Sequence, residues 1–116
     1  MIALSSQHRY FVFQGAADMR NGFDGLCGLV RDHLGCNPLS GDVFVFFNRP
    51  RTHVKILWWD QDGFAIYSKR LERGAFERPA GDDKNSMQIS AQTLTLILQG
   101  IVLSSVKKRK RFNLAA

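Results

Sequence analysis

The chain has 116 residues, 45% of them hydrophobic, and a formal net charge of +6. A length of this order gives one domain with a self-sufficient core, so folding requires neither disulfides nor a structural metal, and we expect no cofactor. Neither a signal-peptide core nor an apolar run of membrane-spanning length is present, which predicts a cytoplasmic protein with no membrane partner.

The N-terminal part of the chain predicts one strand followed by one helix. The strand is expected over Arg9–Gln14 and ends at Gly15. Asp18 is expected to cap a helical turn, because the first amides of a helix lack partners within it. Apolar residues then recur at helical spacing, which predicts a helix that packs on a sheet and ends at Gly35; they are Phe23, Leu26, Cys27, Val30 and Leu34.

The segment from Val43 to Gly74 holds most of the aromatic and β-branched residues and predicts a three-stranded antiparallel meander. Its strands are expected over residues 43–47, 53–59 and 64–70. Asn48 suits the first turn, and Pro50 cannot donate a hydrogen bond to a sheet. Asp62 and Gly63 mark the second turn, where the glycine is expected to take the positive φ of a tight hairpin.

Trp58 and Trp59 are adjacent, so in a strand they must point to opposite faces of the sheet. Two explanations remain open. A helix or a second copy covers each face, or one face is a nucleic-acid platform, with bases stacking on rings such as Trp59 while cations neutralise phosphates. The cations of the meander that suit such a platform are Arg49, Arg51, Lys55, Lys69, Arg70 and Arg73.

The last third of the chain predicts a second helix. Leu71–Pro79 is expected to cross the sheet edge with a turn at Gly74, and a polar loop is expected over residues 80–86. Ser90 is expected to cap a helix that ends at Gly100, with a short closing strand at 101–103. The predicted fold is therefore α+β, a small antiparallel sheet built on the meander and packed by two helices. We expect one domain over 1–106 and a basic tail over 107–116.

The net charge is concentrated in that tail. Its five consecutive cations account for all but one of the charges in the net +6: Lys107, Lys108, Arg109, Lys110 and Arg111. A run of like charges repels itself and often serves as an arm on an anionic polymer, although a purely solubilising tail is the alternative. We expect the arm to contact nucleic acid.

No catalytic or metal-binding constellation emerges from the sequence. Asp60 and Asp62 lie in a predicted turn, where aspartate is expected for backbone reasons, and Asp82 and Asp83 lie in a predicted loop. Cys27 belongs to an apolar helix face, and apolar surroundings lower the reactivity of a thiol. No CxxC pair or zinc-binding spacing is present. We therefore expect neither enzymatic activity nor a metal site.

Several motifs give the chain a family resemblance. They are Asp18-Met19-Arg20, Phe23-Asp24-Gly25-Leu26, Val43-Phe44-Val45-Phe46, Lys55-Ile56-Leu57-Trp58-Trp59-Asp60, Asp62-Gly63-Phe64 and Lys69-Arg70-Leu71-Glu72-Arg73-Gly74. With these, the chain resembles the TnpB-like accessory protein, the product of the second open reading frame, of bacterial insertion sequences of family 66. An unrelated RNA-guided nuclease shares that name and is far longer. The resemblance covers residues 9–79 closely and the last helix more loosely.

The resemblance implies a non-catalytic accessory factor in transposition, that is, in DNA recombination by a mobile element, with strand cleavage left to a separate transposase. Partners implied are DNA, as the ends of the insertion sequence, the transposase and another accessory protein; a homo-oligomer is a further arrangement. The chain departs from the family pattern at Phe47, Pro50 and Ala75, which replace expected cations, and at Arg78, which replaces an aromatic residue. The leading hypothesis is DNA binding and transposase-complex assembly, and the alternative is a protein-interaction adaptor that does not touch DNA.

Overall fold

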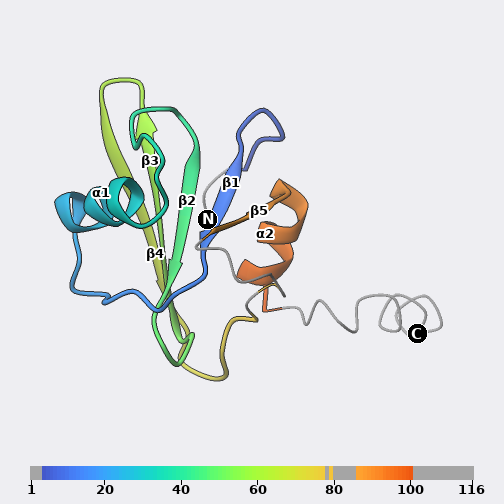
Figure 1. Cartoon of the computed structure of the whole chain (residues 1–116). Helices are drawn as coiled ribbons and strands as arrows, with labels where there is room; N and C mark the ends of the chain where they lie inside the picture. The colour runs from blue at the N-terminus through green and yellow to red at the C-terminus, as the bar shows by residue number, and fades with distance from the viewer. Residues whose placement is uncertain (1–3, 78, 80–85, 101–116) are drawn as a thin grey trace.

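A five-stranded mixed sheet with a helix on either side is formed by residues 4–77, 79 and 86–100, the part of the chain that the computed structural model describes (Figure 1). The strands lie in the order β4-β3-β2-β1-β5. The predicted α+β class is confirmed. The elements in chain order are β1 Tyr10–Phe13, α1 Phe23–Asp32, β2 Val43–Phe47, β3 His53–Asp60, β4 Gly63–Arg70, β5 Ser86–Ile89 and α2 Ala91–Leu98.

The sheet is not wholly antiparallel, because β1 runs parallel to β2. The chain between them carries α1, and a crossover of this kind returns the second strand in the same direction as the first. The expectation of an antiparallel sheet is therefore wrong at this one pair. The remaining pairs are antiparallel, including β1 with β5, a strand that the sequence had not predicted.

The meander is confirmed as β2, β3 and β4, but its turns differ in detail from the prediction. In the β3–β4 hairpin the positive φ, 59°, belongs to Gln61, while Gly63 already pairs with Asp60 as part of β4. The expectation that Gly63 takes the left-handed conformation is therefore wrong. In the β2–β3 turn the left-handed residue is Arg51, with a φ of 57°.

Each face of the sheet carries its own apolar core. On one face α2, through Leu94 among others, packs over residues that include Val45 and Ile56, and on the other α1 packs over residues that include Phe44 and Leu57. Trp58 packs against the core on the α2 side. Trp59 is the next residue of the strand and points to the other face, so the two tryptophans lie on opposite faces, as predicted. The interpretation that a helix covers each face is confirmed (Figure 1).

The starts and ends of the helices follow local chemistry. Ser90 caps α2 as predicted, its Oγ accepting a hydrogen bond of 3.0 Å from the Thr93 amide, and Gly100 follows the helix with a φ of 75°. The N-cap of α1 is Gly22, with no side-chain cap, so the cap expected from Asp18 serves the turn before the helix instead. Phe23, expected on the buried stripe, is 49% exposed.

Several predicted segments lie outside the described residues. They are most of the polar loop, the closing strand at 101–103 and the basic tail at 107–116. Within the described residues, no helix has the length and apolar character needed to cross a membrane.

Candidate nucleic-acid interface

The β2–β3 turn is held in shape by the side chain of Asn48. Its Oδ1 accepts hydrogen bonds from the backbone amides of Thr52, at 2.9 Å, and His53, at 3.1 Å, and its Nδ2 donates to Thr52 Oγ1 at 3.1 Å. The Arg51 amide also donates to the Asn48 carbonyl at 3.1 Å. The amide side chain thus replaces backbone partners across the turn, which fixes the conformation of the arginines beside it.

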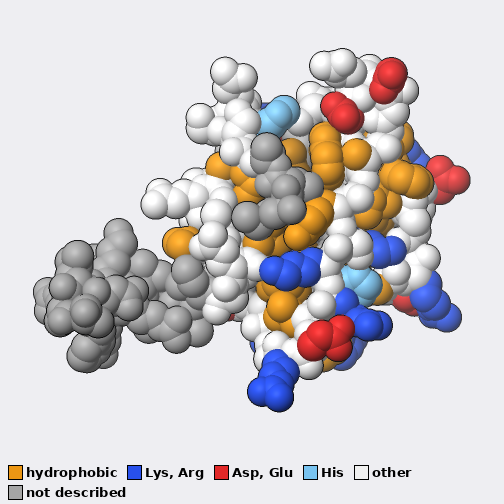
Figure 2. Space-filling model, turned by 180° about the vertical axis from the view of Figure 1, so that it is seen from behind, with side chains coloured by type: hydrophobic (Ala, Val, Ile, Leu, Met, Phe, Trp, Pro, Cys, Tyr) orange, Lys and Arg blue, Asp and Glu red, His pale blue; other side chains and the backbone are white. Residues whose placement is uncertain are grey.

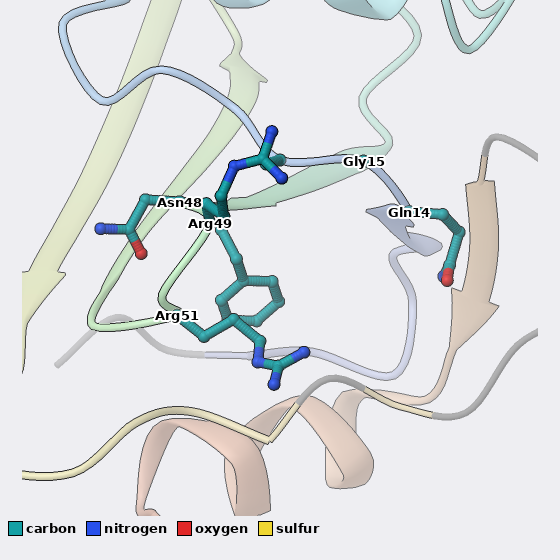
Figure 3. A pocket seen from close by; sticks show the side chains of 7 residues that line it. Gln14, Gly15, Asn48, Arg49 and Arg51 are labelled. Carbon is teal, nitrogen blue, oxygen red and sulfur yellow. The ribbon is translucent and has the colours of Figure 1, made fainter.

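A cavity of about 290 Å³ opens where this turn meets the segment after β1. Figure 3 shows that Arg49 extends from the turn towards the segment that carries Gly15, whereas Arg51 runs to the opposite side, away from Gly15. The Ala17 amide donates to the Phe47 carbonyl at 2.9 Å, which ties the two segments together. The lining residues are Gln14, Gly15, Ala16, Phe47, Asn48, Arg49 and Arg51.

The lining of this arginine pocket suits an anion. It contains two guanidinium groups and no carboxylate. Arg51 Nε is buried and has no hydrogen-bond partner among the described residues, an arrangement that costs about 1–3 kcal/mol. Arg51 also adopts the left-handed conformation, which is unfavourable for a side chain of this size and is concentrated at functional sites.

Two of the predicted site residues donate to carbonyls within the fold. Lys55 Nζ donates to the Asn21 carbonyl at 2.8 Å, on the α1 side of the sheet. Lys69 Nζ donates to the Leu98 carbonyl at 2.9 Å, at the last residue of α2, where a cation is favoured by the helix dipole. The two ammonium groups therefore point to opposite faces, and neither lines the arginine pocket.

Arg70 lies near the same end of the sheet as the arginine pocket. It pairs in register with His53, and its exposed guanidinium makes a 3.4 Å ion pair with Glu72. The pKa of His53 is lowered by burial first and then by the positive charges of Lys55 and Arg70. Arg73 is exposed beyond β4.

The tryptophan of the predicted site lies away from the arginines. Trp59 is half-buried and meets the Phe64 ring edge to face, with 5.0 Å between the ring centres. Both residues adjoin the β3–β4 hairpin, whose Asp60 and Asp62 are exposed. The structure therefore does not bring Trp59 and the arginine pocket together. The tail cations lie outside the described residues.

The meander is thus polarised along its length. The β3–β4 hairpin with its two aspartates lies at the top of Figure 1, and the β2–β3 turn with its arginines lies at the bottom. In the view from behind, most of the visible Lys and Arg side chains gather in the lower half, where acidic side chains lie among them, and further acidic side chains stand at the top (Figure 2). A polyanion is favoured at the lower end of the sheet.

Comparison with known proteins identifies the family of this polarised domain. The family model described as IS66 Orf2 like protein matches residues 8–108, which includes both walls of the arginine pocket. The chain belongs to the IS66 Orf2-like family. As a member, it is a transposition-associated accessory protein of an insertion sequence, and the family is one of accessory proteins rather than a known catalytic family.

Two relatives of this IS66 Orf2-like chain come from Sinorhizobium fredii (strain NBRC 101917 / NGR234). Uncharacterized protein y4hO is 36% identical over 101 residues, which are 87% of each chain. Uncharacterized protein y4jC is 31% identical over 109 residues, 94% of this chain and 92% of that one. No solved structure matches.

Sequence reasoning missed part of this candidate site. Gln14, Gly15 and Ala16 form one wall of the pocket, although they follow a predicted strand and carry no charge. The parallel pairing of β1 with β2 places them beside the turn, and this pairing leaves no local signal. Asn48 was predicted as a turn residue, but its bracing of Arg51 was not. His53 had no predicted role; only its place two residues before Lys55 hinted at a charged neighbourhood.

Proposed function

We propose that this IS66 Orf2-like protein binds the DNA ends of its insertion sequence and thereby helps to assemble the transposase complex, without catalysing a reaction itself. The proposal rests on family membership for the process and on the arginine pocket for the contact. Phosphates of the DNA backbone are the ligands in view, because guanidinium groups match their geometry with two parallel hydrogen bonds.

The observation that carries the proposal is the state of Arg51. Its Nε is buried without a partner among the described residues, its backbone is left-handed, and its neighbour Arg49 contributes a second positive charge to the same cavity. A phosphate in the pocket offsets both positive charges. Such a contact recognises the backbone rather than the bases, so sequence preference is weak.

Fluorescence anisotropy with a duplex of the element's terminal sequence tests this function at several salt concentrations. Wild-type protein is expected to bind with an affinity that falls steeply with salt. The double variant Arg49→Ala/Arg51→Ala should bind more weakly and lower the slope of log K against log[salt] by about two, because each lost phosphate contact removes about one unit. Deleting the tail 107–116 should lower the slope independently.

Arg31→Ala is the matched control, because Arg31 is an exposed cation on α1 and does not line the pocket. It should leave the slope close to that of the wild type. No binding by folded wild-type protein at low salt, or equal losses in the Arg31 and the double variants, would contradict the proposal.

A second function, docking on the transposase or another accessory protein without DNA contact, is favoured by one observation. Trp59 and Phe64 form a half-buried aromatic pair at the acidic end of the sheet, and paired rings of this kind are common anchors in protein interfaces. Under this function Trp59→Ala abolishes co-purification with the transposase, while deletion of residues 107–116 leaves it intact. The reverse pattern supports DNA binding as the main activity.

A further inference from the structure

The strand β4 forms a long open edge of the sheet. Within the described part of the chain it pairs with β3 alone, over all eight residues from Gly63 to Arg70. The opposite edge, β5, has only four residues. Proteins commonly protect long edges with prolines, bulges or charges along the strand. β4 contains no proline, its register with β3 runs without a bulge, and its two charges, Lys69 and Arg70, lie at its last two positions.

The backbone groups that β4 turns outward can be assigned. The Leu71 amide donates to the Thr52 carbonyl at 2.7 Å and extends the β3–β4 ladder by one pair. In an antiparallel ladder, hydrogen-bonded and non-hydrogen-bonded pairs alternate. Because Leu71 belongs to a hydrogen-bonded pair, every second residue before it does too, so the odd-numbered residues of β4 form the backbone hydrogen bonds with β3. The amides and carbonyls on the open side therefore belong to Phe64, Ile66, Ser68 and Arg70.

The side chains of β4 are also only half covered. None of the eight is fully buried, whereas β3 buries Val54, Ile56 and Leu57. Phe64 and Ile66 extend the core on the α1 side, and Tyr67 extends the core on the α2 side. A further strand beside β4 would continue both cores.

We propose that this edge pairs with the same edge of a second copy, antiparallel and about a twofold axis, to form a ten-stranded sheet across a homodimer. Charge selects this occupant. β4 begins next to Asp62 and ends in Lys69 and Arg70. Antiparallel pairing of two identical strands places the acidic start of each beside the basic end of the other, so the edge is complementary to itself.

Charge also selects the register. With Ile66 opposite its own copy, Asp62 lies opposite Arg70 and Phe64 opposite Ser68, all on outward-bonding positions. Moving the register by one pair, so that Tyr67 faces its own copy, sets Asp62 opposite Glu72, which is repulsive. The ion pair of Arg70 with Glu72 does not compete strongly, because at 3.4 Å both side chains are exposed.

Sedimentation equilibrium of the full chain without DNA tests the dimer. We expect a monomer–dimer equilibrium above the monomer mass of 13.1 kDa. Asp62→Arg or Arg70→Asp should each raise the dimer Kd roughly tenfold or more, because each change converts two attractive cross-strand pairs into repulsive ones. The double variant Asp62→Arg/Arg70→Asp should restore dimerisation, since the pair is re-formed with its charges exchanged.

Ser68→Pro provides a second test that does not rely on charge. The Ser68 amide faces the open edge, so proline there removes no backbone hydrogen bond to β3 but blocks the second copy. Proline also removes the Ser68 hydroxyl, which lies 2.6 Å from His53 Nε2, so Ser68→Ala is the control for that loss and should leave the dimer intact. Circular dichroism checks that the variant is folded. A wild-type chain that is monomeric at high micromolar concentration overturns the proposal, and so does a dimer that persists in folded Ser68→Pro. Failure of the double charge exchange to restore the dimer overturns the register.

Discussion

Asp18 and Arg20 show what a single pair of charged residues does in this fold. The Asp18 carboxylate accepts the Arg20 amide at 2.8 Å and pairs with its guanidinium at 2.6 Å, which closes the turn that leads into α1. The sequence alone suggests that Asp18 and Arg20 are structural and pair with Asp24 or a backbone carbonyl. The structural role agrees with these contacts, but the partner of Arg20 is Asp18 itself. The guanidinium first, and then the backbone amide, lower the pKa of Asp18 to about 2.

The lowered pKa of Asp18 predicts a defined pH dependence. The pKa of Asp18 in the folded state, about 2, is below its ordinary value of 3.8. The ionised Asp18 carboxylate therefore stabilises the folded state fully above pH 4, and this stabilisation is lost as the pH falls from about 4 to 2. Thermal unfolding of Asp18→Asn should therefore differ from the wild type at pH 7 and converge with it near pH 2. NMR titration should return the pKa of Asp18 towards its ordinary value in Arg20→Gln. A stable Asp18→Ala that blocks transposition would contradict the structural role.

At the level of elements, α1 is a helix whose sequence has low helix propensity and which is held by tertiary packing. It buries Leu26, Cys27 and Val30 against the sheet, and burial raises the pKa of the Cys27 thiol, which keeps it unreactive. Two glycines of this region have different backbone requirements. Gly28 lies inside the helix with open space at its Cβ position, whereas Gly35 follows the helix with a φ of 64°.

We expect opposite effects from alanine at these two positions. Gly28→Ala should raise the free energy of unfolding by about 0.5–1 kcal/mol, because it restricts the unfolded chain and meets no atom in the fold. Gly35→Ala should lower it by about 1–2 kcal/mol, because an alanine side chain disfavours the left-handed conformation. Urea unfolding measures both. A loss of stability in Gly28→Ala would show that the helix surface is needed for another contact.

The elements that sequence could predict are those with a local signal. The strands of the meander, the Ser90 cap and the glycine that ends each helix follow from residue pattern and turn chemistry. β5 was missed because Ser86–Ile89 is short and follows a polar segment, and it pairs with β1, which is distant in the sequence. The candidate site is likewise only partly predictable. Arg49 and Arg51 were predicted from the sequence, but the wall formed by residues 14–16 was not.

At the scale of the whole molecule, the described residues form one sheet with two cores, while the densest charge of the sequence lies in the tail. We propose that residues 1–106 are the folding unit and that 107–116 add affinity for a polyanion. Five adjacent cations repel one another and do not pack into an apolar core.

The truncated chain 1–106 should therefore unfold at the same temperature as the full chain while binding DNA more weakly. Circular dichroism melting and the anisotropy titration measure these two properties on the same samples. A clear drop in the melting temperature would show that the tail belongs to the folded domain.

The proposed pairing of two β4 edges has a consequence for the length of DNA that the protein would bind. Strands rise about 3.4 Å per residue and lie about 4.8 Å apart, so a twofold axis at Ile66 places the two arginine pockets on the order of 40 Å from each other. That spacing is comparable with one turn of a duplex, roughly 34–36 Å. In the proposed dimer, a DNA fragment longer than a full turn would reach both arginine pockets at once, whereas a shorter fragment would reach a single pocket and dissociate sooner.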